Sequence, residues 1–97
     1  MKRLNVRVEM VDGRELTTQT ALKDYVAYEV TAKRQKPPWG GLSENPSRWE
    51  AFVSWSALRR TGQYDGTWEA FLDDAAIVDA TAEEQVDPTT AVVGEGS

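Results

Sequence analysis

The chain has 97 residues, a length that corresponds to one domain at the smaller end of the sizes that fold alone. It contains neither cysteine nor histidine, so disulfides and thiolate metal sites are excluded, and the commonest general base and metal ligand is missing. No apolar run approaches the ~20 residues that cross a bilayer, and the first ten residues lack the apolar core of a signal peptide; we therefore expect a cytosolic protein.

The net charge of −5 is unevenly distributed along the chain. Residues 1–60 carry all eleven Lys and Arg against seven Asp and Glu, whereas residues 61–97 carry nine acids and no base. This pattern is typical of a folded body followed by a solvated acidic segment. A second interpretation is that the acidic segment contacts a basic partner or the protein's own basic surface. The body has no stripe of basic and aromatic residues, which argues against nucleic acid as a partner.

Apolar residues alternate with polar ones at the start of the chain, at Leu4, Val6, Val8 and Met10. This period of two predicts a half-buried strand, and Asp12-Gly13 then predicts a hairpin. A two-residue turn would place Leu16 on the polar face. A three-residue loop over 11–13, with Gly13 left-handed, pairs Val8 with Leu16 and Val6 with Thr18, and it keeps the apolar face together.

Three helices are predicted, near residues 21–35, 46–61 and 68–80. In the first, Thr20 is a candidate N-cap, and Lys33 and Arg34 lie at the C-terminal end, where the helix dipole favours cations. Its predicted buried stripe is Leu22, Tyr25, Val26 and Val30. This helix is the nearest cover for the apolar face of the hairpin.

The second helix is the most apolar stretch of the chain, and its residues fall on two faces. Its start is marked by Pro46, which suits a first helical turn behind Asn45, and by Ser47 and Glu50, which have the spacing of a capping box. Gly62 follows the last turn. We expect Phe52 to be among the most buried residues of the protein. Its expected neighbours are Trp49, Val53, Leu72 and Val26.

The third helix begins after Thr67, a good N-cap. Beyond Thr81 the sequence is acidic and lacks periodicity, which predicts disorder. The prediction is therefore an α+β domain over 1–81, in which an N-terminal two-stranded β-hairpin packs on a three-helix bundle, followed by a disordered acidic C-terminal tail over 82–97.

The residue types that enzymes combine at active sites do not occur together in this sequence. Asp73 and Asp74 are adjacent and point in different directions on a helix, so they do not form a catalytic pair. Asp12-Gly13 lacks the alternating acids of a calcium loop, and no glycine-rich segment follows a strand in a phosphate-binding pattern. We therefore expect no enzyme, no cofactor and no metal. Four tryptophans on a small domain favour a protein-binding module instead.

The order of the predicted parts, together with FVSWSALRRTG at 52–62 and TWEAFLDD at 67–74, resembles the tail assembly chaperones of long-tailed, siphovirus-type actinobacterial phages. The resemblance covers about residues 3–80, and its specific part is 49–74. It implies a non-catalytic protein that binds the tape measure protein and the major tail tube protein during tail assembly. Such a protein acts in the host cytoplasm and is absent from the mature virion. Self-association is also possible, and neither nucleic acid nor a membrane is implied.

The second face of the central helix makes Trp55 the first candidate for contact with a client. Trp39 in the loop and the basic residues Arg59, Arg60, Lys33 and Arg34 are candidates for the rim of that surface. The alternative is that the hairpin covers one face of this helix and the third helix the other, which would leave Trp55 buried.

Two other classes of function remain open on the sequence. A structural head–tail connector or completion protein would share the size and the mixed fold but would stay in the particle. A small regulatory protein that binds nucleic acid would need a basic recognition helix, and here the basic residues gather only at a helix end.

Overall fold

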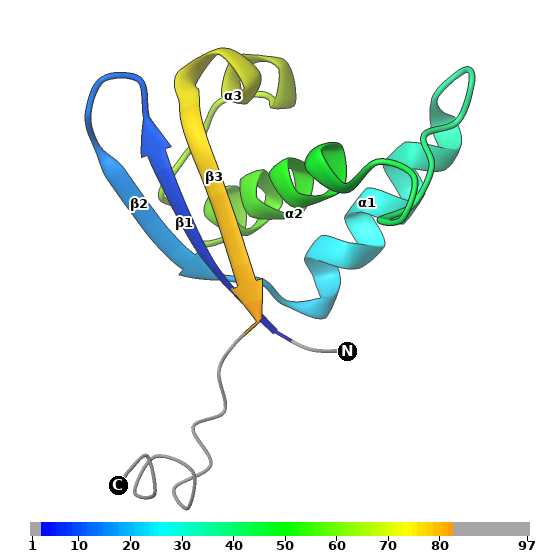
Figure 1. Cartoon of the computed structure of the whole chain (residues 1–97), viewed down its shortest axis with the longest axis horizontal. Coiled ribbons are helices and arrows are strands. Elements are labelled where there is room, and N and C mark those ends of the chain that lie inside the picture. The colour runs from blue at the N-terminus through cyan, green and yellow to red at the C-terminus, as the bar shows by residue number, and fades with distance from the viewer. Residues whose placement is uncertain (1–2, 83–97) are drawn as a thin grey trace, which may run out of the picture.

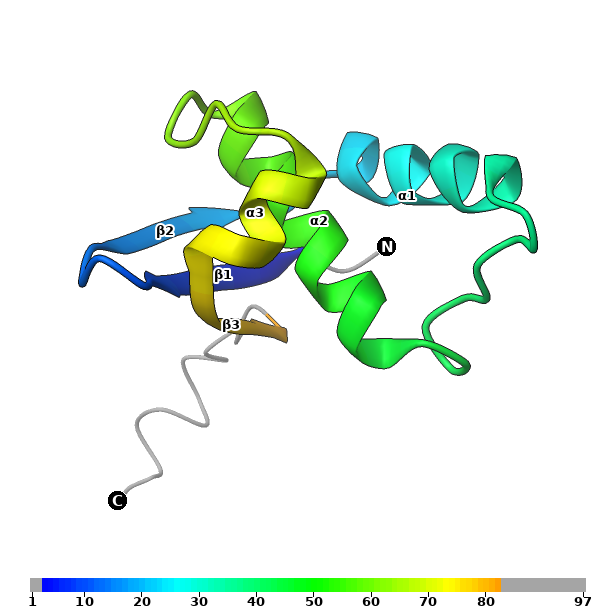
Figure 2. The same cartoon turned by 90° about the horizontal axis from the view of Figure 1, so that it is seen from above.

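The computed structural model describes residues 3–82. The chain forms, in order, β1 (Leu4–Met10), β2 (Glu15–Gln19), α1 (Leu22–Arg34), α2 (Pro46–Arg60), α3 (Trp68–Asp74) and β3 (Ala75–Ala82). The strands form one antiparallel sheet in the order β2-β1-β3. Figures 1 and 2 show α2 between the sheet and α1, with α3 beside one end of the sheet. The α+β class predicted from the sequence is confirmed in this coarse form.

The register of the hairpin is the predicted one. Val8 lies opposite Leu16 and Val6 opposite Thr18. Gly13 has a positive φ of 95° and closes the loop by donating its N–H to the Met10 carbonyl at 2.9 Å. Only glycine adopts this left-handed conformation without a steric cost, and the three-residue loop therefore follows from the sequence.

The predicted third helix over 68–80 is wrong beyond Asp74, because residues 75–82 form strand β3 against β1. Asp73 and Asp74 place two negative charges at the C-terminal end of α3, where the helix dipole disfavours them. Beyond them, Val78 and Ala80 turn toward the core and Asp79 turns away, which is the alternation of a strand. A two-stranded hairpin alone is marginal, and β3 gives β1 a partner on its second edge.

Both edges of the sheet are capped by side chains from α2 and the loop after it. Glu50 Oε2 accepts the Ala80 N–H at 2.8 Å on the β3 edge. Arg60 Nη2 donates to the Gln19 carbonyl at 2.9 Å, and Gln63 Nε2 donates to the Thr17 carbonyl at 2.8 Å, on the β2 edge. Glu50 therefore does not complete the predicted capping box of α2. The N-cap residue is Asn45 and Pro46 lies in the first turn, as predicted. Capped edges protect a sheet from pairing with other chains.

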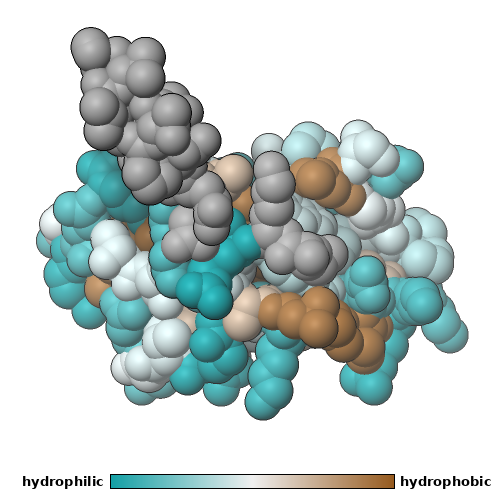
Figure 3. All heavy atoms as spheres, turned by 90° about the horizontal axis from the view of Figure 1, so that it is seen from below, coloured by the Kyte–Doolittle hydropathy of each residue, from teal (hydrophilic) through white to brown (hydrophobic). Residues whose placement is uncertain are grey.

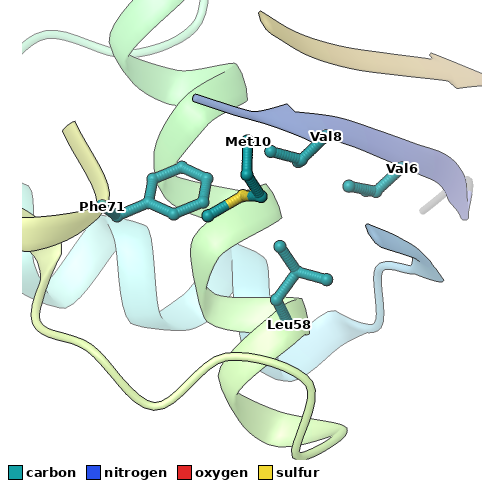
Figure 4. Close-up of a cluster of buried hydrophobic side chains, with 5 residues drawn as sticks. All are labelled: Val6, Val8, Met10, Leu58 and Phe71. Carbon is teal, nitrogen blue, oxygen red and sulfur yellow. The ribbon is translucent and has the colours of Figure 1, made fainter. Parts of the chain in front are cut away.

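The core consists of two clusters on the two sides of α2. Figure 4 shows the sheet cluster, in which three side chains of β1 meet one from α2 and one from α3. Its buried members are Val6, Val8, Met10, Leu58 and Phe71. The aromatic cluster lies between α1 and α2, and its buried members are Tyr25, Tyr28, Ala32, Phe52 and Val53. Trp55 and Trp68 pack against both clusters and join them.

Phe52 is 3% exposed, as predicted, and Val53 is fully buried. Trp49 is half-buried beside them, stacked on Tyr25 with ring centroids 5.6 Å apart. The predicted core positions of Leu72 and Val26 are wrong, since these side chains are 55% and 45% exposed. Phe71, rather than Leu72, is the residue that α3 turns inward, because the short helix reaches the sheet cluster with that face alone.

The buried stripe predicted for α1 is also wrong at three of its four positions. Leu22, Val26 and Val30 face outward, and only Tyr25 is buried. The buried face is formed by Asp24, Tyr25, Tyr28 and Ala32. Tyr28 meets Phe52 edge to face, with ring centroids 5.6 Å apart, and Asp24 forms hydrogen bonds to α2. Aromatic packing and a buried polar anchor orient α1, and the aliphatic residues remain outside.

Of the two threonines predicted to cap helices, one does so in the structure. Thr67 Oγ1 accepts the Ala70 N–H at 3.1 Å and caps α3 as predicted. Thr20 does not cap α1, whose N-cap residue is Ala21. The Thr20 hydroxyl instead accepts the Leu4 N–H at 2.8 Å and bonds to the Tyr25 hydroxyl at 2.6 Å. Thr20 therefore ties the end of the hairpin to β1 and α1.

β3 runs one residue past the predicted domain end, through Ala82, which pairs with Leu4. The predicted disordered tail otherwise lies outside the described residues.

Candidate binding surface

The outer face of α1 carries a line of exposed aliphatic side chains that no other helix or strand of residues 3–82 covers. Leu22, Val26 and Val30 are 65%, 45% and 43% exposed. They are four residues apart, a spacing that places them one above the other on a helix. We call these three residues the α1 stripe. Figure 3 shows hydrophobic side chains gathered on the surface over α1, with hydrophilic residues around them.

Cationic side chains lie along the α1 stripe. Lys23 is beside Leu22, and Lys33 and Arg34 follow Val30 by three and four residues; all three cations are exposed. Glu29 is the one acid on the same side of the helix. Within residues 3–82, the ion pairs use Arg7, Arg14 and Arg60, and none uses a cation of α1. The surface therefore combines an apolar line with basic groups available to an acidic partner.

A buried carboxylate fixes the orientation of this surface. Asp24 is fully buried, and it accepts hydrogen bonds from Ser56 Oγ at 2.7 Å and from Arg60 Nη2 at 3.0 Å. It also accepts the Ala21 N–H at 2.8 Å, which satisfies the first turn of α1. These bonds join α1 to α2 and leave the α1 stripe on the opposite side of the helix.

The six predicted site residues do not form one surface. Arg60 donates hydrogen bonds to Asp24 and to the Gln19 carbonyl, and these bonds stabilise the contact of α2 with α1 and the end of β2. Lys33 and Arg34 are at the other end of α1, about 15 Å along the helix from Asp24 at 1.5 Å per residue. Arg59 is exposed and lies over the Trp55 ring, 5.4 Å from its centroid.

Trp55 and Trp39 are both half-buried. Trp55 packs on Phe52 at a centroid distance of 5.1 Å and on Trp68 at 5.9 Å, and its Nε1 donates to the Gly66 carbonyl at 3.0 Å. A ring with its N–H satisfied inside the protein has the contacts of a core residue. This arrangement matches the buried alternative for Trp55 more closely than the contact surface.

Trp39 closes the outer end of the aromatic cluster. Its ring packs on Tyr28 and Phe52 at 6.0 and 6.1 Å, and the Arg48 guanidinium lies over it at 4.8 Å. The Tyr28 hydroxyl donates to the Gly40 carbonyl, and burial raises the pKa of that hydroxyl above its ordinary value. The loop is therefore folded back onto the core beside the C-terminal end of α1.

The loop also contains a local turn around Glu44. Glu44 Oε1 accepts the Gly41 N–H at 2.8 Å, and this hydrogen bond lowers the pKa of the carboxyl. A side chain at Gly40 would meet the Glu44 Cβ at 2.6 Å, so the turn requires glycine there. The turn lies in the connection between α1 and α2, just before the N-cap residue of α2.

Among residues 3–82, no three acidic side chains are close enough together to hold a metal ion. The same part of the chain has no helix with the length and apolarity needed to cross a membrane. The α1 stripe offers apolar contact and ion pairing to a partner, and neither depends on a bound group.

Comparisons of the chain with protein-family models, curated proteins and solved structures find no match.

The sequence pattern pointed to Lys33 and Arg34, which are exposed on α1, but it did not predict the α1 stripe, because Leu22, Val26 and Val30 have the spacing of a buried face. One signal was available. Tyr25, Tyr28 and Ala32 form a second stripe at helical spacing, in line with Asp24. A buried aspartate is rare, so the presence of Asp24 beside these residues made the stripe resemble a face exposed to solvent.

Proposed function

We propose that this chain is a non-catalytic tail assembly chaperone that binds the tape measure protein and tail tube subunits of a long-tailed phage in the host cytoplasm. The observation that supports the proposal best is the uncovered α1 stripe with its cations. The resemblance of 49–74 to the chaperone family supplies the class of client.

The geometry of the α1 stripe suits a helical client. Three aliphatic side chains in one line on a helix can pack against the apolar face of a second helix, with anchors at i, i+4 and i+8. Lys23, Lys33 and Arg34 favour a client with acidic residues beside its apolar face. A contact of this size is weak when made once, which fits a chaperone that holds a long client at many places.

The predicted site residues divide between two roles in this proposal. Lys33 and Arg34 contact the client, and Arg59 adds a cation on α2. Trp55, Trp39 and Arg60 hold α1 and its loop in place through the core contacts described above. The client surface is therefore centred on α1 rather than on the central helix.

Co-expression with the tape measure protein of the same phage tests the proposal. The full chain is expected to keep the tape measure protein soluble, and the double variant Val26→Ser/Val30→Ser is expected to lose that effect. Ile77→Ser is the control, because Ile77 is somewhat more exposed, at 53%, and lies on β3. Equal solubilisation by all three proteins, or by none, would contradict the proposal.

Mass spectrometry of purified virions separates a chaperone from a structural connector. The chain is expected to be missing from the particles or present in traces. Its presence in a fixed ratio to the tail tube protein would identify a virion component instead.

A further inference from the structure

The α1 stripe needs an occupant, because three neighbouring aliphatic side chains are exposed on one helix of a small domain. A second copy of the same surface is a poor occupant. It would bring Lys23, Lys33 and Arg34 of two chains together, and like charges in contact oppose association. The occupant that fits carries acids next to aliphatic side chains.

The C-terminal segment of this chain has that composition. Residues 83–97 contain four acids and no base. Glu83, Glu84 and Asp87, with Val86 among them, precede Val92 and Val93, and Glu95 follows. Along α1, Lys23 lies at the start of the stripe beside Leu22, and Lys33 and Arg34 lie beyond its end at Val30.

The C-terminal segment also starts close to the beginning of α1. Ala82 pairs with Leu4 in the sheet, and Leu4 bonds to Thr20, which precedes α1. Two strand spacings, or about 10 Å, therefore separate Ala82 from Thr20. Figure 1 shows the end of β3, the start of β1 and the start of α1 close together. From Leu22 to Val30 the helix rises only about 12 Å, and fifteen residues reach up to ~50 Å.

We infer that residues 83–97 dock on the α1 stripe of the same chain, with Val92 and Val93 against Val26 and Val30 and with the acids beside Lys23, Lys33 and Arg34. The contact concerns the isolated chain and holds whatever client the surface binds.

A spin label tests this docking in the full chain. The chain has no cysteine, so Gly94→Cys gives one attachment site for a nitroxide, next to Val93. The methyl signals of Val26 and Val30 are expected to be broadened by the label. Those of Val11 and Leu72, which are exposed at the opposite end of the sheet, are expected to remain sharp.

Charge reversal supplies the specific control, because a tethered segment passes near α1 even without docking. Lys33→Glu/Arg34→Glu is expected to restore the Val30 signal, and so is 1 M salt, at which the screening length falls to ~3 Å. Arg14→Glu at the hairpin tip is expected to leave the broadening unchanged. Three results would overturn the inference: equal broadening at all four residues, broadening that survives the α1 reversal, or broadening that appears only between labelled and unlabelled chains. None of these results would bear on solubilisation of the tape measure protein.

Discussion

The two core clusters are closed in different ways. The sheet cluster is enclosed by β1, α2 and α3 through aliphatic side chains and Phe71, and its three β1 residues are the ones that the alternating sequence pattern predicts to be inside. The aromatic cluster is closed by α1, which contributes two tyrosines, an alanine and a buried aspartate, while its three largest aliphatic residues stay outside. The difference indicates that the residues a helix packs against determine which of its faces is buried.

The largest expected loss of stability comes from removing the side chain at the centre of the aromatic cluster. Phe52 contacts Tyr28, Trp39, Trp55 and Trp68. We expect Phe52→Ala to lower the free energy of unfolding by roughly 3–5 kcal/mol, enough to unfold a domain of this size. Thermal unfolding measures the effect, and Leu72→Ala on the exposed face of α3 is the control. An unchanged melting temperature in Phe52→Ala would show that the aromatic cluster does not support the fold.

Trp55 tests the junction between the clusters. We expect Trp55→Gln to destabilise the isolated protein by roughly 2–4 kcal/mol, because it removes a half-buried ring from both clusters and the N–H bond to Gly66. Urea unfolding gives the value. If Trp55→Gln stays as stable as the natural chain and only loses client binding, Trp55 is a contact residue.

Asp24 tests the polar anchor of α1. We expect Asp24→Ala to cost about 2–3 kcal/mol, because Ser56 Oγ, Arg60 and the Ala21 N–H lose their acceptor at a buried site. Ser56→Ala removes a single bond and should cost about 1 kcal/mol. Urea unfolding of the two variants at neutral pH provides the comparison. Equal stability of both variants and the natural chain would mean that ring packing alone orients α1.

Tyr64 tests the edge of the sheet cluster through pH. Burial and the hydrogen bond to Asp74 raise the pKa of its hydroxyl to about 12, above the ordinary value of 10.0. The neutral hydroxyl is therefore favoured by folding, and its contribution is complete below pH 10 and lost as the pH rises toward 12. Urea midpoints measured across that range should fall less steeply in Tyr64→Phe. Parallel curves for the two proteins would contradict the assignment.

The smallest expected effect is on the outer face of α1. Val26→Ser/Val30→Ser should change the free energy of unfolding by no more than about 0.5 kcal/mol per residue, since both side chains are exposed and contact no core cluster. Circular dichroism and thermal unfolding check this. A loss of several kcal/mol would mean that the α1 stripe is covered by a part of the chain that supports the fold.

The sequence by itself determined the local features of this protein. The alternation over Leu4–Met10, the left-handed Gly13, the cap at Thr67 and the extent of α2 follow from side-chain period and backbone freedom, which act within a few residues. The burial of Phe52 was predictable for the same reason, because it lies in the most apolar helix.

Only the tertiary structure decided the features that depend on distant partners. Residues 75–80 form a strand because β1 offers them an open edge, although their sequence also suits a helix. α1 buries Asp24 and the tyrosines because Ser56, Arg60 and Phe52 on α2 lie opposite them, and this contact leaves Leu22, Val26 and Val30 outside. In both cases the stable arrangement is the one whose tertiary contacts give the lower free energy. Those contacts come from residues distant in the sequence, so the local pattern of one segment cannot predict them.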